Sequence, residues 1–184
     1  MQTYKPTRDE VLASAHKQVG DIIKPDLKVL FCGINPGLYT AAVGHHFGRP
    51  GNRFWKALYA SGFTDHLFHP SEQEALLDIN LGITNIVPRA SATAAEVSTQ
   101  EFLQGRKELT AKVLKYQPKW LAVLGIQAYR QAFDEPKAQL GLQDKKIGET
   151  KIWVLPNPSG LNAHYTVEKL SEVLREFKKY SDPK

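Results

Sequence analysis

The chain has 184 residues, of which 42% are hydrophobic, so it can bury one sizeable core and we expect a single domain. Lys and Arg number 24 against 19 acidic residues, and the resulting charge of +5 favours an anionic partner without requiring one. The single cysteine, Cys32, excludes an intramolecular disulfide, a zinc site built on cysteines and a four-cysteine iron–sulfur cluster.

The amino-terminal part of the chain predicts a short helix. Thr7 and Glu10 have the spacing of a capping box, and apolar residues follow at helical spacing until Gly20. Pro25 then breaks any helix before the first strand. Residues 1–20 contain no apolar run, which argues against a signal peptide or a membrane anchor, so we expect a soluble, cytoplasmic protein.

Residues 29–32 predict a strand that is buried on both faces, because no polar residue alternates with the apolar ones. The strand ends in a Gly-Ile-Asn-Pro-Gly corner at 33–37, where Pro36 and Gly37 prevent a strand or a helix from continuing. Ligands bind at the carboxyl ends of strands in open α/β sheets, so the backbone of this corner and the Asn35 amide are candidate ligand contacts. A tight turn without chemistry is the alternative interpretation.

The segment 39–52 predicts an irregular loop that contains His45 and His46. Adjacent histidines suggest a metal site. However, neighbouring side chains on an extended loop point apart, and no second group of ligands lies nearby in the sequence, so we expect no metal. Asn52 is the predicted N-cap of the next helix. The packing face of that helix is expected to contain Phe54, Trp55 and Leu58.

Capping boxes, apolar runs and breakers predict the remaining elements. A polar loop at 89–97 holds Ser91 and Thr93, whose hydroxyl groups can line a pocket or only satisfy turn backbone. The segment after Pro136 is polar and has no predicted structure. The predicted elements are a helix beginning at the capping box 71–74, a strand at 82–87, a helix from the capping box 98–101 to 116, a strand at 120–125, a helix that includes 128–133, a strand at 151–155 and a helix capped by Thr166.

Buried strands that alternate with amphipathic helices predict an α/β fold. Parallel strands need crossover helices, and these helices cover both faces of the sheet, so we expect a three-layer α/β/α sandwich around a central, mostly parallel sheet. No repeat or Gly/Ser/Pro-rich linker divides the chain. We expect residues 1–26 to form an extension packed on or flanking the domain, and residues 27–184 to form the single domain.

Two strand ends carry the same dipeptide, Asn35-Pro36 and Asn157-Pro158, and two such corners can line one cleft. Together with the segment between them, they resemble the mismatch-specific uracil and thymine DNA glycosylases, a branch of the uracil-DNA glycosylase superfamily. The resemblance runs from about residue 27 to the final helix. It rests on the motifs Gly-Ile-Asn-Pro-Gly-Leu (33–38), Gly-His-His-Phe (44–47), Pro-Gly-Asn-Arg-Phe-Trp (50–55) and Leu-Pro-Asn-Pro-Ser-Gly-Leu (155–161).

Sister branches of this superfamily resemble the chain less. The classical uracil enzymes have an aspartate in the first motif and a histidine in the second, where this chain has Asn35 and Asn157. The single-strand-selective branch shares the asparagine of the first motif but again has a histidine in the second. Branches that hold an iron–sulfur cluster need cysteines that this chain lacks.

The resemblance implies that Asn35 holds the attacking water. An amide does not accept a proton at neutral pH, so Asn35 can only orient that water, and we expect a slower enzyme than relatives with a carboxylate there. Ser91 is a second catalytic candidate, since relatives keep a hydroxyl at this loop position, although the flanking Ala90 and Ala92 depart from the family pattern.

The resemblance also implies a base-binding set and a DNA-contacting loop. Phe47 is expected to stack on the flipped base, and backbone groups around Ile34 to read its edge. Leu161 is expected to fill the space that the base leaves. Relatives often have an arginine shortly after this wedge; here Asn162-Ala163-His164 stands instead, and His164 is a candidate substitute. The full sets are Gly33, Ile34, Phe47 and Asn157 for the base, and Ser159, Gly160, Leu161, Asn162 and His164 for DNA.

The activity implied by this resemblance is excision of uracil that is mispaired with guanine. Thymine and ethenocytosine are the alternative target bases. The partner would be double-stranded DNA with a G·U or G·T mismatch or a damaged pyrimidine, and the product an abasic site for base excision repair. We expect a monomer that needs no cofactor, metal or membrane. Two alternatives remain: a DNA-binding module without catalysis, and a nucleotide-binding hydrolase, against which the absence of a glycine-rich phosphate loop argues.

Overall fold

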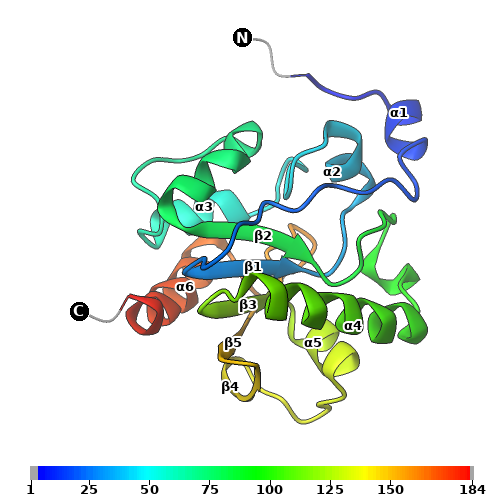
Figure 1. Cartoon of the computed structure of the whole chain (residues 1–184). Coiled ribbons are helices and arrows are strands. Elements are labelled where there is room, and N and C mark those ends of the chain that lie inside the picture. Colours follow the sequence, from blue (N-terminus) through cyan, green and yellow to red (C-terminus); the bar gives the residue numbers. More distant parts are fainter. Residues whose placement is uncertain (1–3, 183–184) are drawn as a thin grey trace.

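The computed structural model describes residues 4–182 and contains one five-stranded sheet with the order β2-β1-β3-β5-β4 (Figure 1). Four strands run parallel and β4 is antiparallel to β5, so the predicted mostly parallel α/β fold is confirmed. The elements are α1 (Arg8–Leu12), β1 (Val29–Gly33), α2 (Leu38–Val43), α3 (Phe54–Ala60), the 3-10 helix η1 (Pro70–Ile79), β2 (Leu81–Asn85), the 3-10 helix η2 (Ala94–Glu96), α4 (Thr99–Tyr116), β3 (Trp120–Leu124), α5 (Ile126–Phe133), β4 (Gly141–Ile147), β5 (Thr150–Leu155) and α6 (Val167–Ser181).

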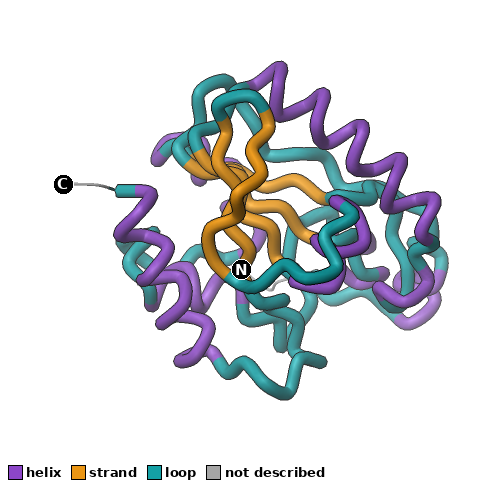
Figure 2. Tube along the Cα trace, turned by 90° about the horizontal axis from the view of Figure 1, so that it is seen from below, coloured by secondary structure: helices purple, strands orange, loops and turns teal. Residues whose placement is uncertain are grey.

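The sheet is the middle of three layers, with helices on both faces (Figure 2). Successive side chains of β1 point to opposite faces, so Phe31 belongs to the core cluster that includes residues of α3 and α6, while Leu30 belongs to the cluster that includes residues of α4 and α5. All five residues of β1 are buried, as a strand covered on both faces requires. Cys32 lies among them, where burial raises the pKa of its thiol and leaves it a small core side chain.

Three elements were missed by the sequence reasoning, namely β4, α2 and the short 3-10 helix η2, which lies in the predicted loop 89–97. β4 lies in the segment after Pro136; it is a polar edge strand, and its lysines and exposed residues hide the apolar pattern by which a strand is recognised. α2 covers the start of the segment 39–52 that was predicted to be irregular, so that prediction is wrong for 39–43, while 44–52 contains no helix or strand. This helix has no side-chain cap at Gly37, and its one sequence signal is Gly44, which ends it in the left-handed conformation with φ 74°.

Three predicted helix starts or ends are corrected. α1 ends at Leu12 rather than near residue 20: a turn follows at 13–16, and His16 has φ 67°, a conformation that a continuing helix does not allow. The 3-10 helix η1 is capped by His69 rather than Ser71, since Pro70 is suited to its first position. Asn52 Oδ1 does accept the Phe54 N–H at 2.9 Å, but the N-cap position is the next residue.

Candidate active site

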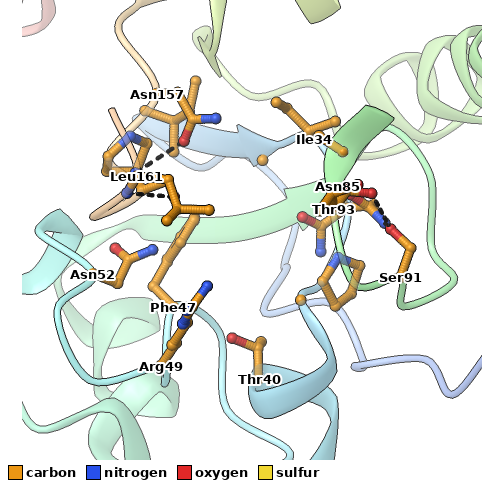
Figure 3. Close-up of a pocket in the computed structure, with 18 of the residues that line it drawn as sticks. Ile34, Thr40, Phe47, Arg49, Asn52, Asn85, Ser91, Thr93, Asn157 and Leu161 are labelled. Atoms are coloured by element: carbon orange, nitrogen blue, oxygen red, sulfur yellow. Dashed lines mark hydrogen bonds between the residues drawn. The ribbon is translucent and has the colours of Figure 1, made fainter. Parts of the chain in front are cut away.

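The carboxyl ends of β1, β2 and β5 meet at one pocket of about 400 Å³ (Figure 3). Parallel strands end at the same edge of a sheet, which is why corners far apart in the sequence come together here. Figure 3 shows Asn157 and Leu161 on one side of the pocket and Ser91 on the other. The predicted site residues that line it are Gly33, Ile34, Asn35, Phe47, Ser91, Asn157, Ser159, Leu161 and Asn162.

The Asn35 amide is held in one orientation by two hydrogen bonds. Its Nδ2 group donates to the Arg89 carbonyl oxygen at 3.1 Å and to Ser91 Oγ at 2.7 Å. A backbone carbonyl can only accept, so the nitrogen of the amide must face Arg89. The Oδ1 atom therefore lies on the other side of the amide group as an acceptor, which can orient a water molecule but cannot take its proton.

Ser91 is buried, and its hydroxyl group is committed to the protein. It donates to the Thr93 carbonyl oxygen at 2.7 Å while its oxygen accepts from Asn35. Its backbone N–H donates to the Pro36 carbonyl oxygen at 3.1 Å, which ties this loop to the first corner. In this geometry Ser91 positions the Asn35 amide, and the hydroxyl hydrogen is not available to a water.

Gly33 lies in a close-packed part of the pocket. A Cβ atom at this position would lie 2.5 Å from Asn85 Oδ1, so any larger residue would displace the Asn85 side chain, whereas the 3.6 Å to the Phe47 ring is an ordinary contact distance. The carbonyl groups of Gly33 and Ile34 accept the N–H groups of Ile86 and Val87, both at 2.9 Å. These bonds anchor the corner to the segment that follows β2.

Phe47 presents an aromatic ring beside this glycine. Its backbone is left-handed, with φ 53°, which is unusual for an aromatic residue and marks a conformation imposed by its surroundings. The ring stacks on buried Phe54 with centroids 4.1 Å apart. An aromatic side chain in a pocket offers a stacking partner for a planar base.

The second corner, which we call the wedge loop (157–162), is ordered by its own hydrogen bonds. Asn157 Oδ1 accepts the Ser159 N–H at 2.9 Å, and the Asn157 carbonyl oxygen accepts Asn162 Nδ2 at 3.0 Å. With Oδ1 engaged, Asn157 has its Nδ2 group to offer a ligand in the pocket. Leu161 stands out from this loop with 72% of its surface exposed, so it contributes little to the core.

Arg53 joins the wedge loop to the start of α3. Its guanidinium group donates to the carbonyl oxygens of Asn162 at 2.7 Å, Ser159 at 3.0 Å and Gly160 at 3.5 Å. Gly160 packs so closely against the facing loop that a Cβ atom would lie 2.7 Å from the Gly51 carbonyl oxygen. The structure thus gives a reason within the protein for glycine at this position, apart from the predicted approach to DNA.

Two predicted site residues, Gly160 and His164, do not line the pocket. His164 is exposed, and its backbone N–H donates to Asn162 Oδ1 at 3.2 Å. Sequence reasoning also missed two residues. Asn85 lines the pocket at the last position of β2, the same strand-end signal that identified Asn35. Arg53 gave no such signal, since its partners follow it by more than 100 residues.

His46 supports the Phe47 segment rather than a metal. Its Nε2 atom is 2.8 Å from the Gly20 carbonyl oxygen, and its own carbonyl oxygen accepts Trp55 Nε1–H at 3.0 Å. Burial lowers the pKa of His46, against the opposing effects of the Gly20 hydrogen bond and of the Asp21 and Glu74 charges. Within residues 4–182, no group of three or more His, Cys, Asp or Glu side chains is arranged to hold a metal ion.

The family model for the uracil DNA glycosylase superfamily matches residues 21–178. The chain therefore belongs to this superfamily, and the fold and the pocket described above agree with that assignment. Membership places the protein among DNA glycosylases, hydrolases that act on DNA in repair. No helix in the part of the chain that the structure describes is both long and apolar enough to cross a membrane.

Proposed function

We propose that this protein is a monofunctional glycosylase of the mismatch-specific branch, which excises uracil opposite guanine from double-stranded DNA and leaves an abasic site. Thymine and ethenocytosine opposite guanine are the alternative substrates. We also propose that it acts in base excision repair in the cytoplasm, as a monomer and without a cofactor. The observation that carries the activity is the Asn35 amide, whose acceptor oxygen is held in an open pocket by Arg89 and Ser91.

The reaction is hydrolysis of the N-glycosidic bond. As this bond breaks, positive charge develops on the sugar and negative charge on the departing base, so a positioned water and donors to the base suffice. Asn35 Oδ1 would accept a hydrogen bond from the water and direct its oxygen at the sugar carbon. Ser91 would act as a positioning residue, because its hydroxyl oxygen accepts one hydrogen of the Asn35 amide. The proton of the water is released to solvent once the new C–O bond has formed.

The rest of the pocket suits a pyrimidine. Phe47 would stack on the flipped base, and the amide groups of Asn85 and Asn157 lie where they can bond its polar edge. Flipping costs a few kcal/mol, and least for a mispair, which favours mismatched over matched DNA. Exposed Leu161 would fill the space left in the duplex.

The direct test is incubation of the purified protein with duplexes that each contain one lesion, in the presence of a chelator. G·U, G·T, ethenocytosine and normal duplexes are compared, and abasic sites are revealed by alkaline cleavage. We expect strand cleavage only after alkali and only from a mismatched or damaged duplex. Cleavage without alkali, or a product trapped by borohydride, would contradict a monofunctional mechanism. Loss of activity in the chelator would contradict metal independence. DNA binding with no abasic product would favour the non-catalytic alternative.

A further inference from the structure

We propose that residues 16–20, which we call the strap, position the active site, and that Val19 is the positioning residue through which they act. This inference rests on the proposed function. The strap precedes the segment matched by the family model, which begins at residue 21. Figure 1 shows the chain passing from α1 beside α2 and along β2 before it enters β1. The five residues contact three parts of the pocket wall that are separate in the sequence.

The first contact is with the loop that orients Asn35. The strap pairs with this loop in antiparallel fashion, Gln18 opposite Arg89. The Ala90 N–H donates to the Lys17 carbonyl oxygen at 2.8 Å, and the Ala90 carbonyl oxygen accepts the His16 N–H at 3.3 Å. Ala90 stands between the two residues that accept hydrogen bonds from the Asn35 amide. The strap therefore fixes the position of both acceptors.

The second contact is made by the Val19 side chain. It is 7% exposed and forms a small apolar cluster with Ala41 and Ala90, against which Leu38 packs. Ala41 and Leu38 belong to α2, the helix that begins directly after the corner that carries Asn35. Val19 thus fills the space between the helix that follows the corner and the loop that holds the amide.

The third contact is with the segment that presents the predicted stacking ring. The Gly20 carbonyl oxygen, which can only accept, is 2.8 Å from His46 Nε2, so this nitrogen carries the hydrogen. His46 is buried and precedes Phe47, whose left-handed backbone depends on what holds its neighbours. Beyond the strap, the Ile22 N–H and carbonyl oxygen pair with the carbonyl oxygen and N–H of Ile83, both at 2.9 Å, and so anchor it to β2.

These contacts predict an effect on rate rather than on DNA affinity. The strap touches neither the wedge loop nor Leu161 through any of the bonds described above, so binding of the duplex should not depend on it. If the Arg89–Ser91 loop shifts, however, the Asn35 amide loses the geometry in which it holds a water. Small misplacements of a group that positions a reactant slow the chemical step by large factors.

The test compares Val19→Ala with Val113→Ala. Both remove the same two methyl groups, but Val113 is fully buried in α4, on the opposite side of the sheet from Phe31 and away from the pocket. The measurements are the single-turnover excision rate on a G·U duplex at saturating protein, the Kd for that duplex, the melting temperature, and the side-chain amide signals of Asn35 in the ¹⁵N–¹H spectrum of the full chain. The Asn35 signals are assigned by their loss in Asn35→Ala.

We expect Val19→Ala to slow excision about tenfold, to change Kd less than twofold and to shift the Asn35 amide signals. Val113→Ala should lower the melting temperature at least as much and leave the other three quantities unchanged. Equal rates for the two variants, or unmoved Asn35 signals in Val19→Ala, would overturn the inference and make the strap a structural cover only. If the wild type excises nothing, the proposed function fails, while the Asn35 signals still decide whether the strap positions the amide.

Discussion

The reaction proposed for this site depends on one amide group, that of Asn35. Asn35→Ala should slow single-turnover excision by roughly two orders of magnitude or more, because orientation of the water matters in the transition state. Affinity for the mismatched duplex should stay within a few-fold, since the water adds little ground-state binding. The check is a rate at saturating protein together with a separate binding titration. Excision that remains near the wild-type rate would make Asn35 a turn residue.

The environment of Asn35 also explains why a carboxylate is not a simple improvement here. In Asn35→Asp the group that faces the Arg89 carbonyl oxygen becomes an acceptor, and both hydrogen bonds from Nδ2 are lost. A general base can speed hydrolysis, yet in this chain the carboxylate would be held only if the Ser91 hydroxyl turned to donate to it instead of to the Thr93 carbonyl oxygen.

A substitution of Phe47 tests whether its ring stacks on the flipped base. Phe47→Leu keeps an apolar side chain but removes the aromatic face, so capture of the flipped base should weaken by roughly 1–3 kcal/mol. Phe133→Leu is the matched control, since Phe133 stacks on Tyr129 with centroids 4.7 Å apart and lies in α5. KM for the G·U duplex and the melting temperature are measured for both variants. A lower melting temperature with unchanged KM in Phe47→Leu would return Phe47 to a packing role.

At the scale of elements, the wedge loop offers a test that distinguishes a DNA-contacting loop of a glycosylase from a turn that only ends a strand. If Leu161 fills the hole in an opened duplex, Leu161→Ala should reduce excision from a G·U duplex much more than from single-stranded uracil DNA, where no hole forms. The exposure of Leu161 predicts little change in melting temperature. Equal losses on the two substrates would remove Leu161 from the DNA interface, provided the wild type acts on both.

Arg53 should influence excision from duplex DNA by holding the wedge loop in place. Arg53→Ala frees three carbonyl groups of the wedge loop, and we expect about tenfold slower excision from the duplex, or roughly 1.4 kcal/mol. Arg53→Lys should restore it in part, because an ammonium group cannot reproduce the planar fork. Arg130→Ala is the control: Arg130 donates to the Ala138 carbonyl oxygen far from the pocket.

A double-mutant cycle then shows how Arg53 acts. If it works by holding Leu161 in place, Arg53→Ala should cost much less in a Leu161→Ala background than alone. Additive losses would mean that Arg53 contributes independently of the wedge, for example through a phosphate contact.

At the scale of the whole molecule, buried His46 links stability to pH. Its folded-state pKa is below the ordinary histidine value of about 6.5, so the unfolded chain binds a proton more readily than the folded one. The contribution of His46 to the free energy of unfolding is therefore fully present above about pH 6.5 and is lost as pH falls from there toward the folded pKa. Urea denaturation at pH 7.5, 6.5 and 5.5 measures this slope.

His46→Gln is the comparison, since glutamine can donate to the Gly20 carbonyl oxygen but does not titrate in this range. Stability should then fall less steeply with acid than in the wild type, whatever the absolute loss. An unchanged slope would show that other groups dominate the acid response.

The sequence by itself determined four of the five strands of the sheet and the two corners. Apolar runs such as 29–32 indicate a strand covered on both faces, and Asn35 and Asn157 follow such runs closely, so the α/β fold and nine of the residues that line the pocket could be predicted. Local signals of this kind depend on residues a few positions apart. Those of β4 and α2 were too weak to be recognised, because an edge strand tolerates polar residues and a helix can begin without a side-chain cap.

Only the tertiary structure decided how the site is held. The Arg89 carbonyl oxygen that orients Asn35 is 54 residues from it, and Arg53 reaches carbonyl groups more than 100 residues away. The hydrogen bonds of the strap use the carbonyl oxygens of Lys17 and Gly20, which any residue type would supply, and Val19 adds one apolar side chain that has no partner nearby in the sequence. Such bonds leave no residue pattern in the sequence, because their partners are brought together by the order of the strands and by burial, and not by spacing along the chain.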